Sequence, residues 1–175
     1  MQTGQDRPSV VARMKMGIGL GANLGDRVGA VKAAIDWLRV LDPEARLSGL
    51  YESEPEDCPE GSPRFVNAAA EIEFEDRPEV LLERMQNVER EMGRPEVRGR
   101  NAPRPLDMDL LYAEDTIMVS EHLILPHPRM VERVFVLQPL VEICPERVIP
   151  GTGRTVAMVL AGLLERGGKL CRRIE

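Results

Sequence analysis

The stretch FVNAAAEIEFEDRPEVLLERMQNVEREMG, residues 65–93, decides the fold class, because the spacing of its apolar residues changes partway along. From Val66 to Phe74 the apolar side chains recur at every second position, which predicts a β-strand with one core face and one open face. After Asp76 they recur at three- and four-residue steps, as in an amphipathic helix, and Gly93 stands where helices commonly end. A strand that leads directly into a helix is therefore the centre of the predicted fold.

Upstream of this unit, the sequence predicts an earlier strand and helix and one further strand. Residues 16–20 form a short apolar run that is typical of a buried strand, and residues 28–38 then carry apolar side chains at helical spacing. Pro43 closes this helix. Residues 46–51 are predicted to form a strand, and a loop at 52–64 with three prolines follows it.

Downstream, a loop at 94–105 precedes a strand at 106–112 whose even-numbered residues are apolar, and a final helix is predicted at 156–164. Five prolines separate short apolar pieces between that strand and that helix. The order strand, helix, strand, strand, helix, strand predicts an α+β fold, a ferredoxin-like βαββαβ sandwich. Its antiparallel sheet would carry helices on one face and leave the other face available, and extra C-terminal elements would follow.

Length and composition predict one globular domain. The 175 residues are 43% apolar and 30% charged, close to the averages of soluble domains, and one domain usually holds about 100–150 residues. Residues 1–13 are polar at first and lack an apolar signal core, so we expect a flexible leader at 1–13 and a single domain at 14–175.

Charge and hydropathy exclude several classes of partner and location. A net charge of -6 argues against a protein that coats nucleic acid or an anionic membrane. The longest apolar run, 156–161, is far shorter than the roughly 20 residues that span a bilayer. Cys58, Cys144 and Cys171 are scattered and odd in number, which is typical of reduced, inert thiols and indicates a cytoplasmic protein.

Two aspartates in the segment RPLDMDLL, residues 104–111, are the strongest chemical feature. Residues two apart in a strand face the same side, so Asp107 and Asp109 would project together, with Cα atoms about 6.5–7 Å apart. Paired carboxylates repel each other unless a cation lies between them, and Mg²⁺ prefers one or two carboxylates completed by water and phosphate oxygens. The alternative is a solvated strand face that happens to carry two acids.

Four arginines lie just before this pair: Arg94, Arg98, Arg100 and Arg104. Guanidinium groups bind phosphate oxygens through paired, charge-assisted hydrogen bonds, and a mobile loop can deliver them to a bound nucleotide. Metal-binding acids beside arginines are typical of enzymes that transfer phosphoryl groups. The alternative is a surface loop whose arginines form ion pairs with Glu89 and Glu91.

Phe65 and Asn67 share the open face of the strand at 65–75, where an exposed aromatic ring needs an explanation. Phenylalanine offers a stacking face, and asparagine offers both a hydrogen-bond donor and an acceptor, so the pair suits a flat polar heterocycle. The alternative is that Phe65 packs beneath the preceding loop.

Five motifs, taken together, resemble the 6-hydroxymethyl-7,8-dihydropterin pyrophosphokinase family of folate biosynthesis. They are GLGANLGDR (19–27), YESEP (51–55), FVNAA (65–69), the segment 100–111 and LPHPRMVERVFVLQPL (125–140). The resemblance extends over about residues 16–160 and implies a ferredoxin-like α+β fold. It implies a cytoplasmic ATP-dependent transferase, a kinase of diphosphate groups, with ATP as co-substrate and two Mg²⁺ ions. The implied reaction moves the β,γ-diphosphate of ATP to the pterin hydroxymethyl group and releases AMP.

The resemblance also implies roles for particular residues. Asp107 and Asp109 correspond to the metal-binding aspartates, and Arg104 and Arg94 complete the implied catalytic set. The residues that would bind ATP are Gln86, Glu89, Arg100, Arg104, His127 and Arg133. The residues that would bind the pterin are Gly21, Ser53, Glu54, Glu56, Phe65, Asn67 and Phe135, of which the two phenylalanines would sandwich the ring.

Four positions depart from the family pattern: Glu96, Asn101, His122 and Pro128. They affect the expected closure of the loop at 94–105 and the affinity for ATP, and leave the metal pair unchanged. No side chain stands out as a general base. The expected partners are the two small substrates, without nucleic acid or membrane, and we expect a monomer or a weak homo-oligomer.

Two other functions are compatible with parts of the pattern. Another Mg²⁺-dependent transferase, such as a nucleotidyltransferase, would also use paired aspartates but would release pyrophosphate instead of AMP. A non-catalytic ferredoxin-like ligand-binding module would show no dependence on Mg²⁺.

Overall fold

An antiparallel sheet forms the middle layer of the structure, a computed structural model that describes residues 13–56, 58–93 and 103–175. Its strands are β1 (Met14–Ala22), β2 (Arg46–Leu47), β3 (Tyr51–Ser53), β4 (Phe65–Phe74), β5 (Asp107–Ala113) and β10 (Arg172–Arg173). They are ordered β10-β3-β4-β1-β5, and β2 also pairs with β4. The predicted leader at 1–13 lies outside the described residues, except for Arg13.

The strand predicted at 46–51 is divided into β2 and β3. Ser48, between them, has its hydroxyl oxygen 2.8 Å from the backbone nitrogen of Ala69, which donates to it. The backbone N–H of Ser48 donates to the Ala69 carbonyl oxygen at 3.0 Å. A side chain thus replaces one backbone acceptor, and this interrupts the ladder that the apolar pattern predicted.

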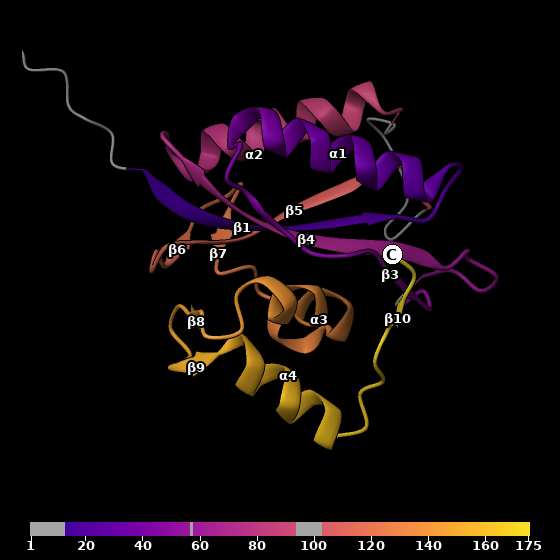
Figure 1. Ribbon diagram of the computed structural model, residues 1–175. Helices are drawn as coiled ribbons and strands as arrows, with labels where there is room; N and C mark the ends of the chain where they lie inside the picture. The colour runs from indigo at the N-terminus through magenta and orange to yellow at the C-terminus, as the bar shows by residue number, and fades with distance from the viewer. Residues whose placement is uncertain (1–12, 57, 94–102) are drawn as a thin grey trace, which may run out of the picture.

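Helices α1 (Arg27–Leu41) and α2 (Pro78–Glu91) cover one face of the sheet, as the apolar spacing predicted (Figure 1). The Asp26 carboxylate accepts a hydrogen bond from the Gly29 N–H at 2.9 Å and so caps the start of α1. Pro78 opens α2, where its missing N–H costs nothing. The α+β ferredoxin-like class is confirmed.

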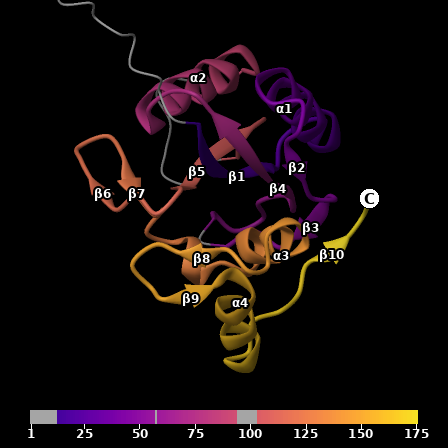
Figure 2. The same cartoon turned by 60° about the vertical axis from the view of Figure 1, so that its left-hand side comes forward.

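The opposite face of the sheet is available only in part: helices cover much of it, and a cavity remains at one end. Helix α3 (Val134–Ile143) lies against it, and α4 (Val156–Glu165) packs on α3, so that the two helices form a third layer, which Figure 2 shows from a second angle. On β4, Ala69 and Glu71 are buried beneath this layer. The final helix predicted at 156–164 is confirmed as α4, whereas α3 was missed.

The remaining elements connect these layers. They are the hairpin of β6 (Met118–Val119) and β7 (Ile124–Leu125), the short helix η1 (Met130–Glu132) and the hairpin of β8 (Val148–Ile149) and β9 (Arg154–Thr155). Where β5 pairs with β1, the register shifts between Gly17 and Ile18. Within the described part of the chain, no helix has the length and apolar character needed to cross a bilayer.

Candidate active site

A cavity of about 300 Å³ opens between the sheet and the start of α3. Most of the predicted site residues line it: Gly21, Ser53, Glu54, Glu56, Phe65, Asn67, Arg104, Asp107, Asp109, His127, Arg133 and Phe135. They come from four strands or the loops beside them and from the region leading into α3, so the fold brings together residues more than a hundred positions apart. Residues expected to bind ATP and residues expected to bind the pterin thus line the same cavity.

Asp107 and Asp109 point into the same cavity because β5 is a regular strand at this end. Asp107 pairs with Gly21 and Asp109 with Gly19 on β1, so no neighbouring side chain fills the strand surface beside them. A Cβ atom on Gly21 would lie 3.6 Å from Asn67 Oδ1 and 3.7 Å from Phe65 Cδ1. Glycine at that position therefore keeps the floor of the cavity open.

Asp107 and Asp109 have different electrostatic surroundings. Arg104 Nη1 lies 2.8 Å from Asp107 Oδ2. Burial, followed by the negative charge of Asp107, raises the pKa of Asp109 to about 7. The Nε atom of Arg104 is buried and has no hydrogen-bond partner among the described residues. A cation bound between Asp107 and Asp109 would relieve the repulsion between their carboxylates.

The two aspartates fit a magnesium ion better than a metal held by protein ligands alone. Across residues 13–56, 58–93 and 103–175, no three His, Cys, Asp or Glu side chains cluster closely enough to hold a metal. Two hard oxygen ligands without a third protein ligand suit Mg²⁺, which keeps several waters and takes its other ligands from phosphate oxygens. The residues present therefore fit the ion that the sequence predicted.

Glu89 is buried and bonded to the backbone of β5. It was expected to line the ATP pocket, but only 3% of it is exposed, and it borders neither this cavity nor the neighbouring one described next. Its Oε1 atom accepts a hydrogen bond from the Met108 N–H at 2.7 Å, between the two aspartates. Glu89 thus holds β5 at the residue between the two aspartates, and the contact with ATP expected for it remains a prediction from the sequence.

A second cavity, also of about 300 Å³, adjoins the first, because Asp109 and His127 line both. Gln86 lies here, together with His122 and Pro128, two of the positions that depart from the family pattern. Burial and the nearby positive charge of Arg133 lower the pKa of His127, so its ring is neutral at pH 7. Its Nδ1 atom accepts from the Arg129 N–H at 3.2 Å, which leaves the ring proton on Nε2.

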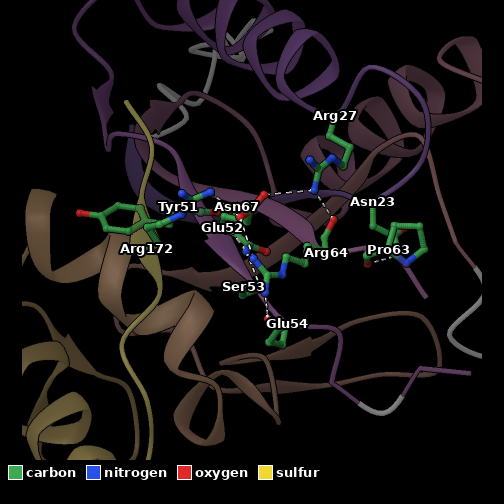
Figure 3. Close-up of polar contacts among 10 residues, drawn as sticks. All are labelled: Asn23, Arg27, Tyr51, Glu52, Ser53, Glu54, Pro63, Arg64, Asn67 and Arg172. Atoms are coloured by element: carbon green, nitrogen blue, oxygen red, sulfur yellow. Dashed lines mark hydrogen bonds and ion pairs between the residues drawn. The ribbon is translucent and has the colours of Figure 1, made fainter. Parts of the chain in front are cut away.

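The amide of Asn67 has a fixed orientation (Figure 3). Its Nδ2 atom donates to Ser53 Oγ at 2.9 Å and to the Tyr51 carbonyl oxygen at 3.4 Å. Both amide hydrogens are thereby engaged, so the group left for a ligand is the acceptor Oδ1 on the side of Gly21. A ligand at this place must present an N–H donor.

The sequence did not predict a role in the site for Asn23 or Arg129. Asn23 is buried, and its Oδ1 atom accepts from the Arg104 N–H at 2.8 Å. Its Nδ2 atom donates to the Pro63 carbonyl oxygen at 3.4 Å (Figure 3), so it joins the approach to β5 with the loop at 52–64. Arg129 lines the first cavity and adds a cation there. The signal in the sequence that could have pointed to a role in the site is their position in motifs, 19–27 for Asn23 and 125–140 for Arg129.

Five predicted or divergent positions lie outside the described residues: Arg94, Glu96, Arg98, Arg100 and Asn101. The roles expected for the arginines therefore remain predictions from the sequence.

Known proteins resemble this chain in sequence over most of its length. It is 41% identical over 132 residues to 2-amino-4-hydroxy-6-hydroxymethyldihydropteridine pyrophosphokinase of Bacillus subtilis, which covers 74% of this chain and 77% of that protein. It is 39% identical over 141 residues to the folic acid synthesis protein fol1 of Pneumocystis carinii, and 41% identical over 127 residues to a folate synthesis bifunctional protein of Arabidopsis thaliana. These matches cover 80% and 72% of this chain but only 19% and 26% of those two longer proteins.

Solved structures share its fold. The crystal structure of Plasmodium falciparum HPPK-DHPS with pteroate superposes with a TM-score of 0.69 at 13% identity, covering 89% of this chain and 45% of that one. At this identity the likeness supports the fold alone. Residues 17–145 match the sequence profile of 7,8-dihydro-6-hydroxymethylpterin-pyrophosphokinase. With the bacterial relative alike over three quarters of both chains, the chain belongs to the 7,8-dihydro-6-hydroxymethylpterin-pyrophosphokinase (HPPK) family.

Proposed function

We propose that this chain is an ATP-dependent pyrophosphokinase of folate biosynthesis. It transfers the β,γ-diphosphate of ATP to the hydroxymethyl group of 6-hydroxymethyl-7,8-dihydropterin and releases AMP. The observation that carries the proposal is that two adjacent carboxylates and two phenylalanine rings, Phe65 and Phe135, line one cavity. Family membership supports the same reaction.

In this proposal, Asp107 and Asp109 would hold two Mg²⁺ ions, which would supply Lewis acidity and neutralise negative charge on the phosphate oxygens. Arg104 and Arg133 bind the same phosphate groups from the cavity wall, and Arg94 and Arg100 approach from the loop at 94–105. Gln86 and His127 face the adjoining cavity and serve the rest of the nucleotide, with His127 offering its Nε2 proton as a donor. The pterin hydroxyl then attacks the β-phosphorus in line with the departing AMP.

Phe65 and Phe135 hold the pterin ring between them, and Asn67 Oδ1 accepts a hydrogen bond from a ring N–H or amino group. Ser53, Glu54 and Glu56 border the same place, where their main-chain groups can complete the hydrogen bonds of the ring. In this arrangement the pterin ring lies at the start of β4, and the phosphates lie beside β5. The hydroxymethyl group would thus point toward the two aspartates.

Product analysis tests this function. We would incubate the protein with ATP, Mg²⁺ and 6-hydroxymethyl-7,8-dihydropterin and separate the nucleotides by ion-exchange chromatography. AMP that appears in step with the pterin diphosphate supports the proposal. Release of pyrophosphate would indicate a nucleotidyltransferase, and turnover independent of Mg²⁺ would contradict the role of the aspartates.

The substitution Asp109→Asn should lower turnover by at least about 100-fold, because it removes one negative charge that holds the ions. Asp115→Asn is the matched control: it makes the same chemical change at an exposed position just beyond β5. Equal activity of the two variants would exclude Asp109 from the reaction.

Location and assembly are further parts of the proposal. Cys58, Cys144 and Cys171 are all free thiols, which suits the reducing cytoplasm. We infer a monomer or a weak homo-oligomer, and light scattering across a range of protein concentrations tests this.

A further inference from the structure

The geometry points to Gln138 of α3 as a positioning residue for the substrate site, one that acts through the segment 170–175 and the strand β3 on the amide of Asn67. The inference rests on the proposed function, since Asn67 is taken there to bind the pterin. Gln138 and residues 170–175 do not line the first cavity, so any effect on the substrate must be transmitted.

The first step is the dependence of Asn67 on β3. Ser53 Oγ and the Tyr51 carbonyl oxygen, both on β3, are the acceptors that keep the Asn67 amide nitrogen turned away from the cavity. If β3 moved away from β4, the amide could rotate and present a donor where the ligand needs an acceptor. The position of β3 therefore decides which group the cavity offers.

The second step is the dependence of β3 on β10. β3 has only three residues, and in the sheet it lies between β4 and β10. Arg172 pairs with Glu52 and Arg173 with Tyr51 in the antiparallel ladder. The Arg172 guanidinium also lies 2.8 Å from Glu52 Oε2, and these residues meet from distant parts of the chain (Figure 3). The segment 170–175 therefore closes the outer side of β3.

The third step is the way α3 holds this segment. Gln138 Oε1 accepts a hydrogen bond from the Cys171 N–H at 2.7 Å, and its Nε2 atom donates to the Cys171 carbonyl oxygen at 3.2 Å. One side chain thus satisfies both backbone groups of the residue before β10, as a neighbouring strand would. This double contact fixes β10 at the height that pairing with β3 requires.

We call the two hydrogen bonds between Gln138 and the backbone of Cys171 the clamp. α3 also connects this clamp with the side of the cavity where Phe135 lies. Phe135, Gln138 and Glu142 are spaced by three and four residues, so they share one face of the helix. Phe135 lines the cavity, whereas Glu142 Oε2 accepts from the Tyr51 hydroxyl at 2.8 Å. A single helix face thus sets the position of the aromatic ring and of the strand that orients Asn67.

The clamp lies partly outside the part of the chain that defines the family. The family profile matches residues 17–145, which include Gln138 but not the segment 170–175. A third cavity, of about 560 Å³, lies between that segment and the substrate site and is bordered by Ser53, Phe135 and Cys171. The arrangement is thus an addition to the site that works without touching the substrate.

The test compares Gln138→Leu, which removes both hydrogen bonds, with Gln138→Glu, which keeps an acceptor for the Cys171 N–H. We expect the KM for the pterin to rise about 5- to 10-fold in Gln138→Leu and by a smaller factor in Gln138→Glu. The KM for ATP and kcat should stay within about twofold, because the phosphate side of the cavity is unchanged. Deletion of residues 170–175 should act in the same direction, and the two point variants decide if that shorter chain does not fold.

The matched control is Lys32→Met, which removes an exposed ion pair with Glu175 on the same segment but leaves the Gln138 contacts intact. Its KM for the pterin should equal that of the unaltered protein. In ¹⁵N-resolved NMR spectra, the side-chain amide of Asn67 should shift in Gln138→Leu, while that of Asn23 serves as the internal reference.

Two results would overturn the inference: an unchanged KM for the pterin in Gln138→Leu, or equal rises in the KM for both substrates. Failure of the unaltered protein to release AMP would instead overturn the proposed function, so the two failures are distinguishable.

Discussion

At the scale of single residues, Asp109 shows how a site can be prepared for a cation at some cost to folding. It is half-buried at the edge of the cavity with Asp107 beside it, and both features disfavour its charged form. Its pKa is about 7 in the folded chain, whereas in the unfolded chain it has the ordinary value of 3.8. Between these values the folded state binds more protons than the unfolded state, so stability falls as the pH rises.

We therefore predict that Asp109→Asn stabilises the metal-free protein above pH 7, where the buried charge is fully present in the unaltered chain. The melting temperature should rise by at least about 2–4 °C, the change that ~1 kcal/mol produces in a domain of this size. The gain should disappear as the pH falls toward 4, since Asp109 is then protonated in the folded state. Thermal melts across pH 4–8 measure this, and a constant difference between the two proteins would contradict it.

At the scale of elements, the pairing of β1 with β5 depends on a close approach at Gly17. A Cβ atom at Gly17 would lie 2.2 Å from the ring of Tyr112, which is completely buried. At Gly19 the nearest atom to such a Cβ would be 3.5 Å away, an ordinary contact. Two glycines on one strand thus have different reasons to be there.

We predict that Gly17→Ala destabilises the fold by about 2–3 kcal/mol, because the Tyr112 ring would have to move within a packed core. Gly19→Ala is the matched control and should change the unfolding free energy by less than about 1 kcal/mol. Chemical denaturation measures both. Equal losses would show that the approach of the ring is not the determinant.

The elements also show what the sequence could predict. Apolar periodicity identified α1, α2, β4 and β5, because each has an uninterrupted pattern that matches its own period. It missed α3, where Pro139 lies inside the helix and normally argues against one. Burial of Leu137 and Leu140 against the sheet offsets the lost hydrogen bond, and a local pattern cannot reveal such tertiary packing. β3 and β10 were beyond prediction as a pair because they are 119 or more positions apart and only three and two residues long.

At the scale of the whole molecule, a buried polar network joins the sheet to the layer of α3 and α4. Glu71 of β4 accepts hydrogen bonds from the Tyr112 hydroxyl at 2.8 Å and from Arg147 at 3.2 Å. Its side chain is 4% exposed, whereas that of Arg147 is 17% exposed and belongs to the segment after α3. The third layer thus supplies the cation that a buried carboxylate on the sheet requires.

We predict that Arg147→Met lowers the free energy of unfolding by about 3 kcal/mol, since it leaves the Glu71 charge buried without its main partner. Adding Glu71→Gln to that variant should restore part of the loss. Thermal and chemical unfolding of the single and double variants measure the coupling. Additive losses would contradict the pairing.

The sequence also predicted much of the site, for a reason that applies to the whole molecule. Strand parity was sufficient for Asp107 with Asp109 and for Phe65 with Asn67, because these pairs lie on single strands. Bringing the two pairs together with Phe135 requires the third layer, which periodicity did not predict. Strand parity could not predict that Glu89 of α2 would accept a hydrogen bond from the backbone of β5, because this contact joins two separate elements.

The register shift between β1 and β5 divides β5 into a part that carries the site carboxylates and a part that packs against the third layer. Strict alternation would put Tyr112 on the same side as Met108 and Leu110, in the core beneath α1 and α2. After the shift, Tyr112 instead joins Leu111 in the core beneath α3 and α4, where Glu71 meets it. Asp107 and Asp109, before the shift, therefore face the cavity. Tyr112, after the shift, faces the third layer, and its direction does not depend on that of the two carboxylates.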